Sequence, residues 1–299
     1  MTQTKTSKKD KMAIGFAACM LLPAILHFCI FYIYINSQSF LLAVKDDNGW
    51  TLEYLSRFFT EITQSGSELS EALGRTLIFF VFSNFVMFPL SLVFSYLLYK
   101  KVAGHKYFRI VFFLPSIISA TVLVGLFRNI VDGPILEWWK QLTNNSIVGL
   151  SFLQSEQYTF SFILVYQCWI GLGGNLIIYS GTMSRIPQEV IESAKIDGVG
   201  FWRELFDMVI PLIWPTISTL LLLSFVNIFG ASGPLLLFDV ENSYKTQTVA
   251  HWIFRISHRP ANAQYNYAAA AGLVFTVVQL PITFFVRWIT KKIDSEVEY

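Results

Sequence analysis

Six long runs of this sequence contain no Asp, Glu, Lys or Arg. A helix needs about 20 mainly apolar residues to cross the hydrocarbon core of a bilayer, so each run can supply one crossing. Trimmed to their apolar centres, the runs predict six membrane-spanning helices, at residues 13–35, 76–99, 110–128, 158–182, 208–229 and 267–289. The predicted fold class is therefore an all-α membrane protein.

The composition excludes several other classes. Charged residues make up 14% of the chain, against about 25% in a typical soluble protein. Hydrophobic residues make up 54%, so polar side chains are too few to cover a soluble core. The net charge of +2 provides no extended basic surface for nucleic acid. The three cysteines lack metal-ligand spacing, and we expect neither a nucleic-acid partner nor a metal site.

The first run follows a tail with four lysines, as a secretory signal would. Its apolar part is longer than a usual signal, and no small-x-small cleavage pattern closes it, which favours an uncleaved span. Residues 1–75 are therefore predicted to form a cytoplasmic tail, the first span and an outer loop. Within that loop, residues 52–62 have apolar residues at helical spacing. Residues 76–299 are predicted to form a core of five spans.

The distribution of Lys and Arg predicts the orientation in the membrane. Loops on the cytoplasmic side carry an excess of these residues. With the N-terminus inside, 14 of the 22 Lys and Arg residues lie on the cytoplasmic side. The turn at residues 100–109 has four of them and no acidic residue. Both termini are therefore predicted to be cytoplasmic.

The sequence lacks the residue patterns that several classes of membrane protein require. No predicted span has a charged residue at its centre, which disfavours an ion-coupled transporter. No Gly-x-x-x-x-Gly-Lys-Ser/Thr phosphate loop and no common hydrolase motif occurs. We therefore expect no catalytic residue in this chain, although a membrane enzyme and a passive channel remain open as alternatives at this point.

The segment at residues 185–207, between the fourth and fifth spans, has the pattern of two short helices. Pro187, Val190, Ile191 and Ala194 form one apolar stripe at helical spacing. Gly198 follows where helices commonly end in a left-handed residue. Such an element suits either a docking surface or an amphipathic helix resting on the bilayer, and the spacing alone does not decide between them.

A motif in this segment resembles the EAA loop of permease subunits in binding-protein-dependent ABC importers. Glu192, Ala194, Gly198 and Pro211 match that pattern at the right spacing, and Ser193 replaces its middle alanine. The cores Ala194–Gly198 and 113–119 resemble the carbohydrate-uptake branch of this family. The resemblance covers roughly residues 76–290, with the first span as a common addition.

The resemblance implies a type I importer permease fold in which the 185–207 loop contains a cytoplasmic coupling helix. Its expected ATPase-coupling residues are Glu192, Ser193, Ala194, Asp197, Gly198 and Pro211. It also implies a second homologous permease subunit, two ATP-binding subunits that carry the ATP, an extracytoplasmic sugar-binding protein, and a bacterial or archaeal cytoplasmic membrane.

A sugar needs amides for its hydroxyls and aromatic faces for its ring, along a protein-lined path. The substrate-path candidates in the spans are Asn84, Tyr166, Gln167, Trp169, Asn175 and Asn227. Each can instead make an interhelical hydrogen bond, the commoner use of such residues. The same machine carrying a non-sugar solute, such as glycerol phosphate or a peptide-like compound, is the main alternative function.

Overall fold

The computed structural model describes residues 8–46, 49–143, 151–230, 234–239, 245–258 and 264–294. Within them, four continuous helices are long and apolar enough to cross a membrane: Gly15–Val44, Glu68–Tyr99, Thr159–Met183 and Tyr265–Ile293. Two bent helix pairs have the same character: His105–Ile117 with Ala120–Leu142, and Phe201–Leu212 with Trp214–Val226. With each bent pair taken as one crossing, the structure has the six predicted spans.

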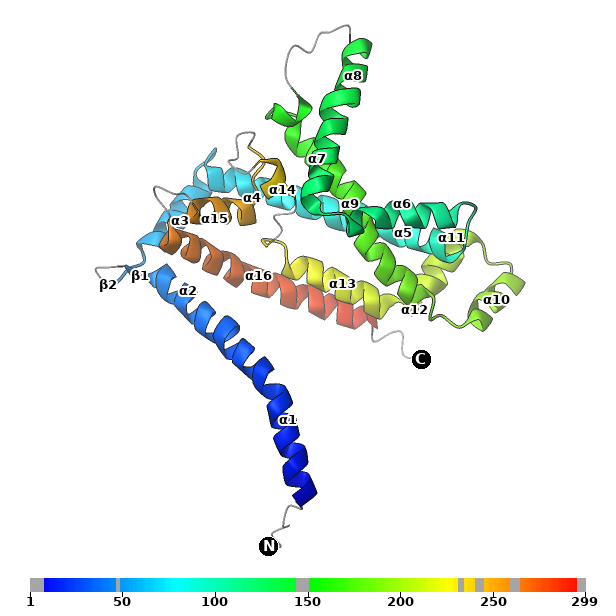
Figure 1. Cartoon of the computed structure of the whole chain (residues 1–299), viewed down its shortest axis with the longest axis horizontal. Helices are drawn as coiled ribbons and strands as arrows, with labels where there is room; N and C mark the ends of the chain where they lie inside the picture. Colours follow the sequence, from blue (N-terminus) through cyan, green and yellow to red (C-terminus); the bar gives the residue numbers. More distant parts are fainter. Residues whose placement is uncertain are drawn as a thin grey trace.

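The elements follow one another along the chain with few long connections (Figure 1). The first span and its hairpin comprise α1 (Lys8–His27), the π-helical segment η1 (Phe28–Tyr34), α2 (Ile35–Val44) and the antiparallel strands β1 (Lys45–Asp46) and β2 (Gly49–Trp50). Next come α3 (Glu53–Thr63), α4 (Glu68–Val81), π-helical η2 (Phe82–Met87), α5 (Phe88–Tyr99), α6 (His105–Ile117), α7 (Ala120–Ile130), π-helical η3 (Val131–Ile135), α8 (Leu136–Leu142) and the 3₁₀ segment η4 (Phe152–Gln154).

The second half of the chain begins with α9 (Thr159–Met183), a helix of 25 residues. It continues with α10 (Gln188–Ile196), α11 (Phe201–Glu204), π-helical η5 (Leu205–Val209), α12 (Ile210–Leu212), α13 (Trp214–Val226), α14 (Leu235–Phe238), α15 (Val249–Ser257) and α16 (Tyr265–Asp294). The predicted helix at residues 52–62 is thus confirmed as α3, and the two short helices of the 185–207 loop as α10 and α11. The division at residue 75 stays a prediction, and α4 already begins at Glu68.

The third span differs from the single helix predicted over residues 110–128. It breaks after Ile117, and the two parts are bent by 114°. Pro115 removes one backbone donor from the last turn of α6. Ile118 then takes an extended backbone, as does Ser119. The break is therefore encoded by a proline followed by residues that favour extended structure.

The fifth span, predicted as one helix over residues 208–229, is also broken. It is bent by 75° at Ile213. Pro215 cannot donate a hydrogen bond to the carbonyl group four residues earlier, so a continuous helix loses one bond there. The helix restarts with Pro215 in its first turn, where no donor is needed.

The central helix α9 packs against both α5 and α6, and α16 packs against α2, α3 and α13. The first span packs on α16 through α2, whereas its α1 part extends away from the rest of the molecule (Figure 1). None of the apolar window of this span is buried. Its exposed apolar side chains suit contact with lipid, because its backbone groups are satisfied within the helix.

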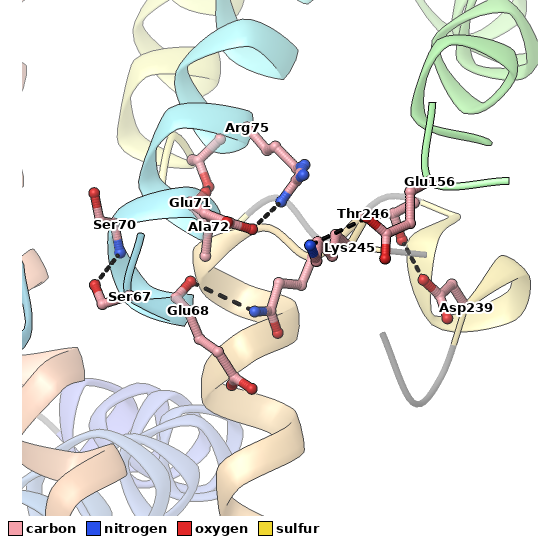
Figure 2. A network of polar contacts seen from close by, with 12 residues as sticks. Ser67, Glu68, Ser70, Glu71, Ala72, Arg75, Glu156, Asp239, Lys245 and Thr246 are labelled. Carbon is pink, nitrogen blue, oxygen red and sulfur yellow. Dashed lines mark hydrogen bonds and ion pairs between the residues drawn. The ribbon is translucent and has the colours of Figure 1, made fainter. Parts of the chain in front are cut away.

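A polar network fixes the start of α4, at the opposite end of the molecule from α10 (Figure 1). The side-chain amide of Gln247 donates to the Glu68 carbonyl at 3.4 Å. The Thr246 hydroxyl donates to the Asp239 carboxylate at 2.9 Å. Figure 2 shows both contacts, with the 245–247 segment lying along the first turn of α4. Asp239, Thr246 and Gln247 are buried, whereas Glu68 is exposed. The Gln247 contact attaches the buried segment to the first turn of α4, which gives this helix a fixed end.

Candidate functional site

A cavity of about 350 Å³ lies between α4, η2, α9 and α13. Four of the six predicted substrate-path residues line it: Asn84, Gln167, Asn175 and Asn227. They come from three different spans, so the fold brings together amides that are up to 143 positions apart in the sequence. Among the described residues, no charged side chain lines this cavity. The cavity therefore offers neutral donors and acceptors.

Asn84 has an unused acceptor at this cavity. Its residue is 7% exposed, and its Nδ2 donates to the Phe80 carbonyl at 3.0 Å. Its Oδ1 is buried and has no hydrogen-bond partner in the described structure. A buried amide oxygen without a partner costs about 1–3 kcal/mol. A ligand hydroxyl would recover that energy once a movement of the cavity wall exposes this oxygen.

The α9 wall of the cavity consists of one helical face. Gln167, Gly171 and Asn175 are four residues apart and therefore lie above one another. A Cβ atom on Gly171 would lie 3.5 Å from the Gln167 Nε2 atom and 3.4 Å from the Met87 Cε atom. The glycine thus leaves room between the two amides that any side chain would reduce.

Tyr166 and Trp169 do not line this cavity. Tyr166 is fully buried in another cluster, with its ring centroid 5.1 Å from that of Phe127 and 5.0 Å from that of Phe238. Trp169 packs against the same cluster. The cavity's aromatic surface comes instead from Phe79, Phe80 and Phe88.

The sequence contained a signal for these phenylalanines. Phe80 and Phe88 are four residues before and after Asn84, on the same helical face. Residues flanking Gln167 directly in the sequence point elsewhere, because neighbours on a helix are about 100° apart. A spacing of four from Asn84 identifies Phe80 and Phe88, whereas it does not identify Phe79.

In the 185–207 loop, helix α10 ends at a C-terminal capping motif around Gly198. Gly198 has a φ of +70°, in the left-handed region where a side chain is strained. Its N–H donates to the Lys195 carbonyl at 3.2 Å, and the N–H of Val199 donates to the Ala194 carbonyl at 3.0 Å. These two bonds are those of a Schellman motif. The angle between α10 and the following chain is therefore set by backbone hydrogen bonds.

The two faces of α10 have different roles. Glu192, Ser193 and Asp197 are exposed, whereas Ala194 is only 2% exposed and packs inward. Ile191, from the same apolar stripe, belongs to a buried cluster with Leu205 and residues of α5 and α9. Of the stripe, Ile191 and Ala194 thus pack on this chain itself and are not available to a partner. The polar edge of α10 is the face open to a partner.

Pro211, the last residue of the sequence motif, is partly buried in α12, directly before the bend at Ile213. It stands in the first turn of α12, where its missing N–H leaves no acceptor unpaired. It marks where the loop joins the fifth span.

An ion pair joins this loop to the second span. The Lys100 Nζ atom lies 2.7 and 2.8 Å from the two Glu204 carboxylate oxygens. The Tyr96 ring packs against Phe201 with centroids 4.8 Å apart, beside this pair. No local pattern indicates the pair, because its members are 104 positions apart. It attaches α11 to the end of α5.

The six crossings, a neutral polar cavity between them and a rigid helical loop at one end define the class: the permease subunit of an ABC importer. A bacterial ABC transporter that imports the acidic polysaccharide alginate has a subunit of the same fold, with a TM-score of 0.81. That subunit is 22% identical, and the match covers 95% of this chain and 98% of the other.

The chain belongs to the family of binding-protein-dependent transport system inner membrane components, whose model matches residues 19–298. It is therefore a transport subunit and not an enzyme. Protein LplB of Bacillus subtilis is 25% identical over 97% of this chain and 91% of its own length. The lactose permease protein LacF of Rhizobium radiobacter is 25% identical over 88% and 89%. YteP of Bacillus subtilis, a polygalacturonan/rhamnogalacturonan permease protein, is 24% identical over 93% and 88%.

Proposed function

We propose that this chain forms the translocation path of an ATP-driven importer for an oligosaccharide or related glycoside. Relatives that match most of its length are named for lactose and for polygalacturonan or rhamnogalacturonan transport. These names support a saccharide as the solute; they include a neutral sugar and acidic polysaccharides, so they do not fix its charge. The convergence of four amides and three phenylalanines on one cavity is the observation that carries the proposal.

The cavity chemistry favours a neutral solute. Sugar hydroxyls both donate and accept, and an amide offers both functions without a charge. The Asn84 Oδ1 atom accepts a hydroxyl proton, while the phenylalanine rings contact the apolar C–H faces of a pyranose. A phosphate or carboxylate solute would lack a cationic partner among the described lining residues. A neutral glycoside therefore fits better than a glycerol phosphate.

The loop containing α10 is proposed to dock on a separate ATPase subunit on the cytoplasmic side. Glu192, Ser193 and Asp197 supply the exposed polar contacts. Ala194 and Gly198 set the position and angle of the helix from within the chain. The four Lys and Arg residues of the α5–α6 turn, with no acidic residue beside them, support a cytoplasmic location with both termini on that side.

The proposed assembly contains this chain, a second homologous permease subunit and two ATPase subunits that bind the ATP. A sugar-binding protein delivers the solute from the outer side. This chain holds no phosphate loop in its sequence, so the energy for transport would reach it through the α10 contact alone. The second permease subunit would bind one part of the sugar, and the amides of this chain would bind the other part.

Uptake by the complete importer in proteoliposomes tests the solute class. Labelled neutral saccharides are compared with glycerol 3-phosphate and a tripeptide, each with the binding protein present. Asn84→Leu should lower saccharide uptake by about tenfold, because one hydrogen bond to a neutral group is worth about 1 kcal/mol and the apolar replacement also desolvates the hydroxyl.

Asn36→Leu is the matched control. Asn36 also donates to the carbonyl four residues earlier, at 2.6 Å, but it is exposed on the first span and lines no described cavity. Import of glycerol phosphate or peptide without saccharide import would reject the sugar assignment. Equal uptake by the Asn84 and Asn36 variants would remove the cavity from the path.

A further inference from the structure

A second and larger cavity, of about 460 Å³, lies beside the loop and outside the translocation path. Its walls come from the end of α5 and the turn after it, from α6, from the end of α9, and from α10. These elements meet at the end of the molecule where α10 and α11 lie (Figure 1). The lining includes the cations of Lys100, Lys101, Arg109 and Lys195, and the carboxylate of Glu192.

The charges of this cavity do not cancel. Lys100 is neutralised by its ion pair with Glu204. Lys101, Arg109 and Lys195 form no ion pair with the described part of the chain, and Glu192 is the one carboxylate in the lining. Three cations against one carboxylate leave a formal charge of +2. Like charges held around one space repel each other, so the cavity favours an anion between them.

The backbone at Lys101 is unusual for a residue other than glycine. This residue has a φ of +51°, in the left-handed region. Such a backbone costs a non-glycine residue about 1–2 kcal/mol, and it ends the α5 helix where glycine is the usual choice. A lysine kept in a strained position next to two other cations suggests a use for its charge.

The surroundings of Arg109 indicate which anion fits. The residues next to it in the sequence, Tyr107, Phe108 and Ile110, are exposed apolar side chains on other faces of α6 and do not line the cavity. The α6 helix thus presents apolar surface to lipid close to the basic cavity, although Arg109 is the residue of α6 that lines it. Arginine binds phosphate oxygens with a planar pair of donors. Basic recesses between spans on the cytoplasmic side suit phospholipid headgroups.

We propose that this cavity binds the phosphate of an anionic phospholipid, which bridges the α5–α6 turn and α10. The turn contributes Lys101, α6 contributes Arg109 and α10 contributes Lys195. The placement in the cytoplasmic leaflet rests on the proposed function, whereas the binding itself does not. A bound lipid would hold α10 against the spans close to the Lys100–Glu204 pair, because Lys100 also lines the cavity.

Lipid retention by the purified full-length chain tests this proposal without any transport. The chain is exposed to detergent micelles with equal amounts of phosphatidylglycerol and phosphatidylcholine, and bound lipid is measured by native mass spectrometry. Wild type should retain phosphatidylglycerol in preference. Lys101→Gln with Arg109→Gln should weaken that retention about 30-fold, since each surface cation contributes about fivefold to anionic lipid binding. Lys106→Gln, an exposed lysine on α6 that lines no described cavity, should leave retention unchanged.

The Lys101→Gly variant distinguishes a ligand-binding role of Lys101 from a structural role. It removes the cation and also relieves the left-handed strain, so thermal stability should rise or stay the same while lipid retention falls about fivefold. Equal retention of the two lipids by wild type, or an unchanged preference in the double variant, overturns the proposal. Full displacement of phosphatidylglycerol by inorganic phosphate at equal concentration would identify a site for soluble phosphate and overturn the lipid assignment.

Discussion

The ion pair between Lys100 and Glu204 allows a quantitative test of how the loop is attached to the spans. At N–O distances of 2.7 and 2.8 Å, the attraction is about 6 kcal/mol for an effective dielectric constant of about 20. Desolvation of both groups offsets much of this energy, so the pair as a whole contributes little. Removing only one partner leaves the other charge with its desolvation cost alone.

Unequal exposure predicts unequal effects of the two single variants. The Glu204 side chain is 4% exposed and the Lys100 side chain 21%. Lys100→Met leaves a carboxylate that water hardly reaches, and we expect a loss of about 3–5 kcal/mol in the free energy of unfolding. Glu204→Gln leaves an ammonium group that can turn towards water, for a loss of about 1–2 kcal/mol. Lys100→Met combined with Glu204→Leu removes both charges and should lie within about 1 kcal/mol of wild type.

Thermal unfolding of the purified complex, followed by tryptophan fluorescence, ranks the variants. Wild type and the double variant should be most stable, followed by Glu204→Gln and then Lys100→Met. ATPase stimulation by solute-loaded binding protein should fall in the same order, because a loosely attached loop transmits less displacement. Arg203→Gln is the control, since its pair with Asp207 is well exposed and worth less than about 1 kcal/mol. A double variant no more stable than Lys100→Met, or equal losses in the two single variants, would refute the reasoning.

Two glycine positions give further predictions. Gly173→Ala should destabilise the packing of α9 on α6 by about 1–3 kcal/mol, because its Cβ atom would lie 2.6 Å from the Phe112 carbonyl oxygen. Gly174→Ala is the control, because a Cβ atom there would have no neighbour within 4 Å. It should be neutral or stabilising in the same thermal assay. Gly198→Val should reduce co-purification of the ATPase subunit and solute-stimulated ATPase activity, because a β-branched residue cannot adopt the left-handed backbone easily. Gly198→Asn should retain both, since asparagine tolerates that backbone; a defect in both variants would show that the angle of the turn is not what matters.

Features that depend on a local run of residues could be read from the sequence. The six crossings follow from charge-free runs, and the helix stop at Gly198 follows from a glycine after an amphipathic segment. The bends at Ile118 and Ile213 were harder to place, because a proline weakens a helix over a full turn and tertiary packing decides where the break falls.

The site was predictable by residue type and only in part by position. Amides are costly in hydrocarbon, so Asn84, Gln167 and Asn227 had to face protein or a cavity. Which of them would meet depends on how each helix is rotated, and a sequence does not give that rotation directly. Tyr166 shows the consequence, because its sequence neighbour Gln167 lines the cavity while Tyr166 itself is buried against Phe127.

The cavity and the loop are connected by a single helix, and this gives the proposed coupling a physical route. Glu68–Tyr99 is continuous over 32 residues. The polar network holds its first turn, Asn84 and Phe88 line the cavity at its middle, and Lys100 follows its last residue. The one irregular stretch is the π-helical segment η2, which contains Asn84.

Such segments interrupt the regular hydrogen-bond ladder and are frequent at functional sites. With the start of α4 fixed, a displacement of the loop acts on α5 through the ion pair, and the helix can yield most easily at η2. The bend would then change the direction of the Asn84 amide and the Phe88 ring, so that movement at the ATPase contact alters the cavity wall itself.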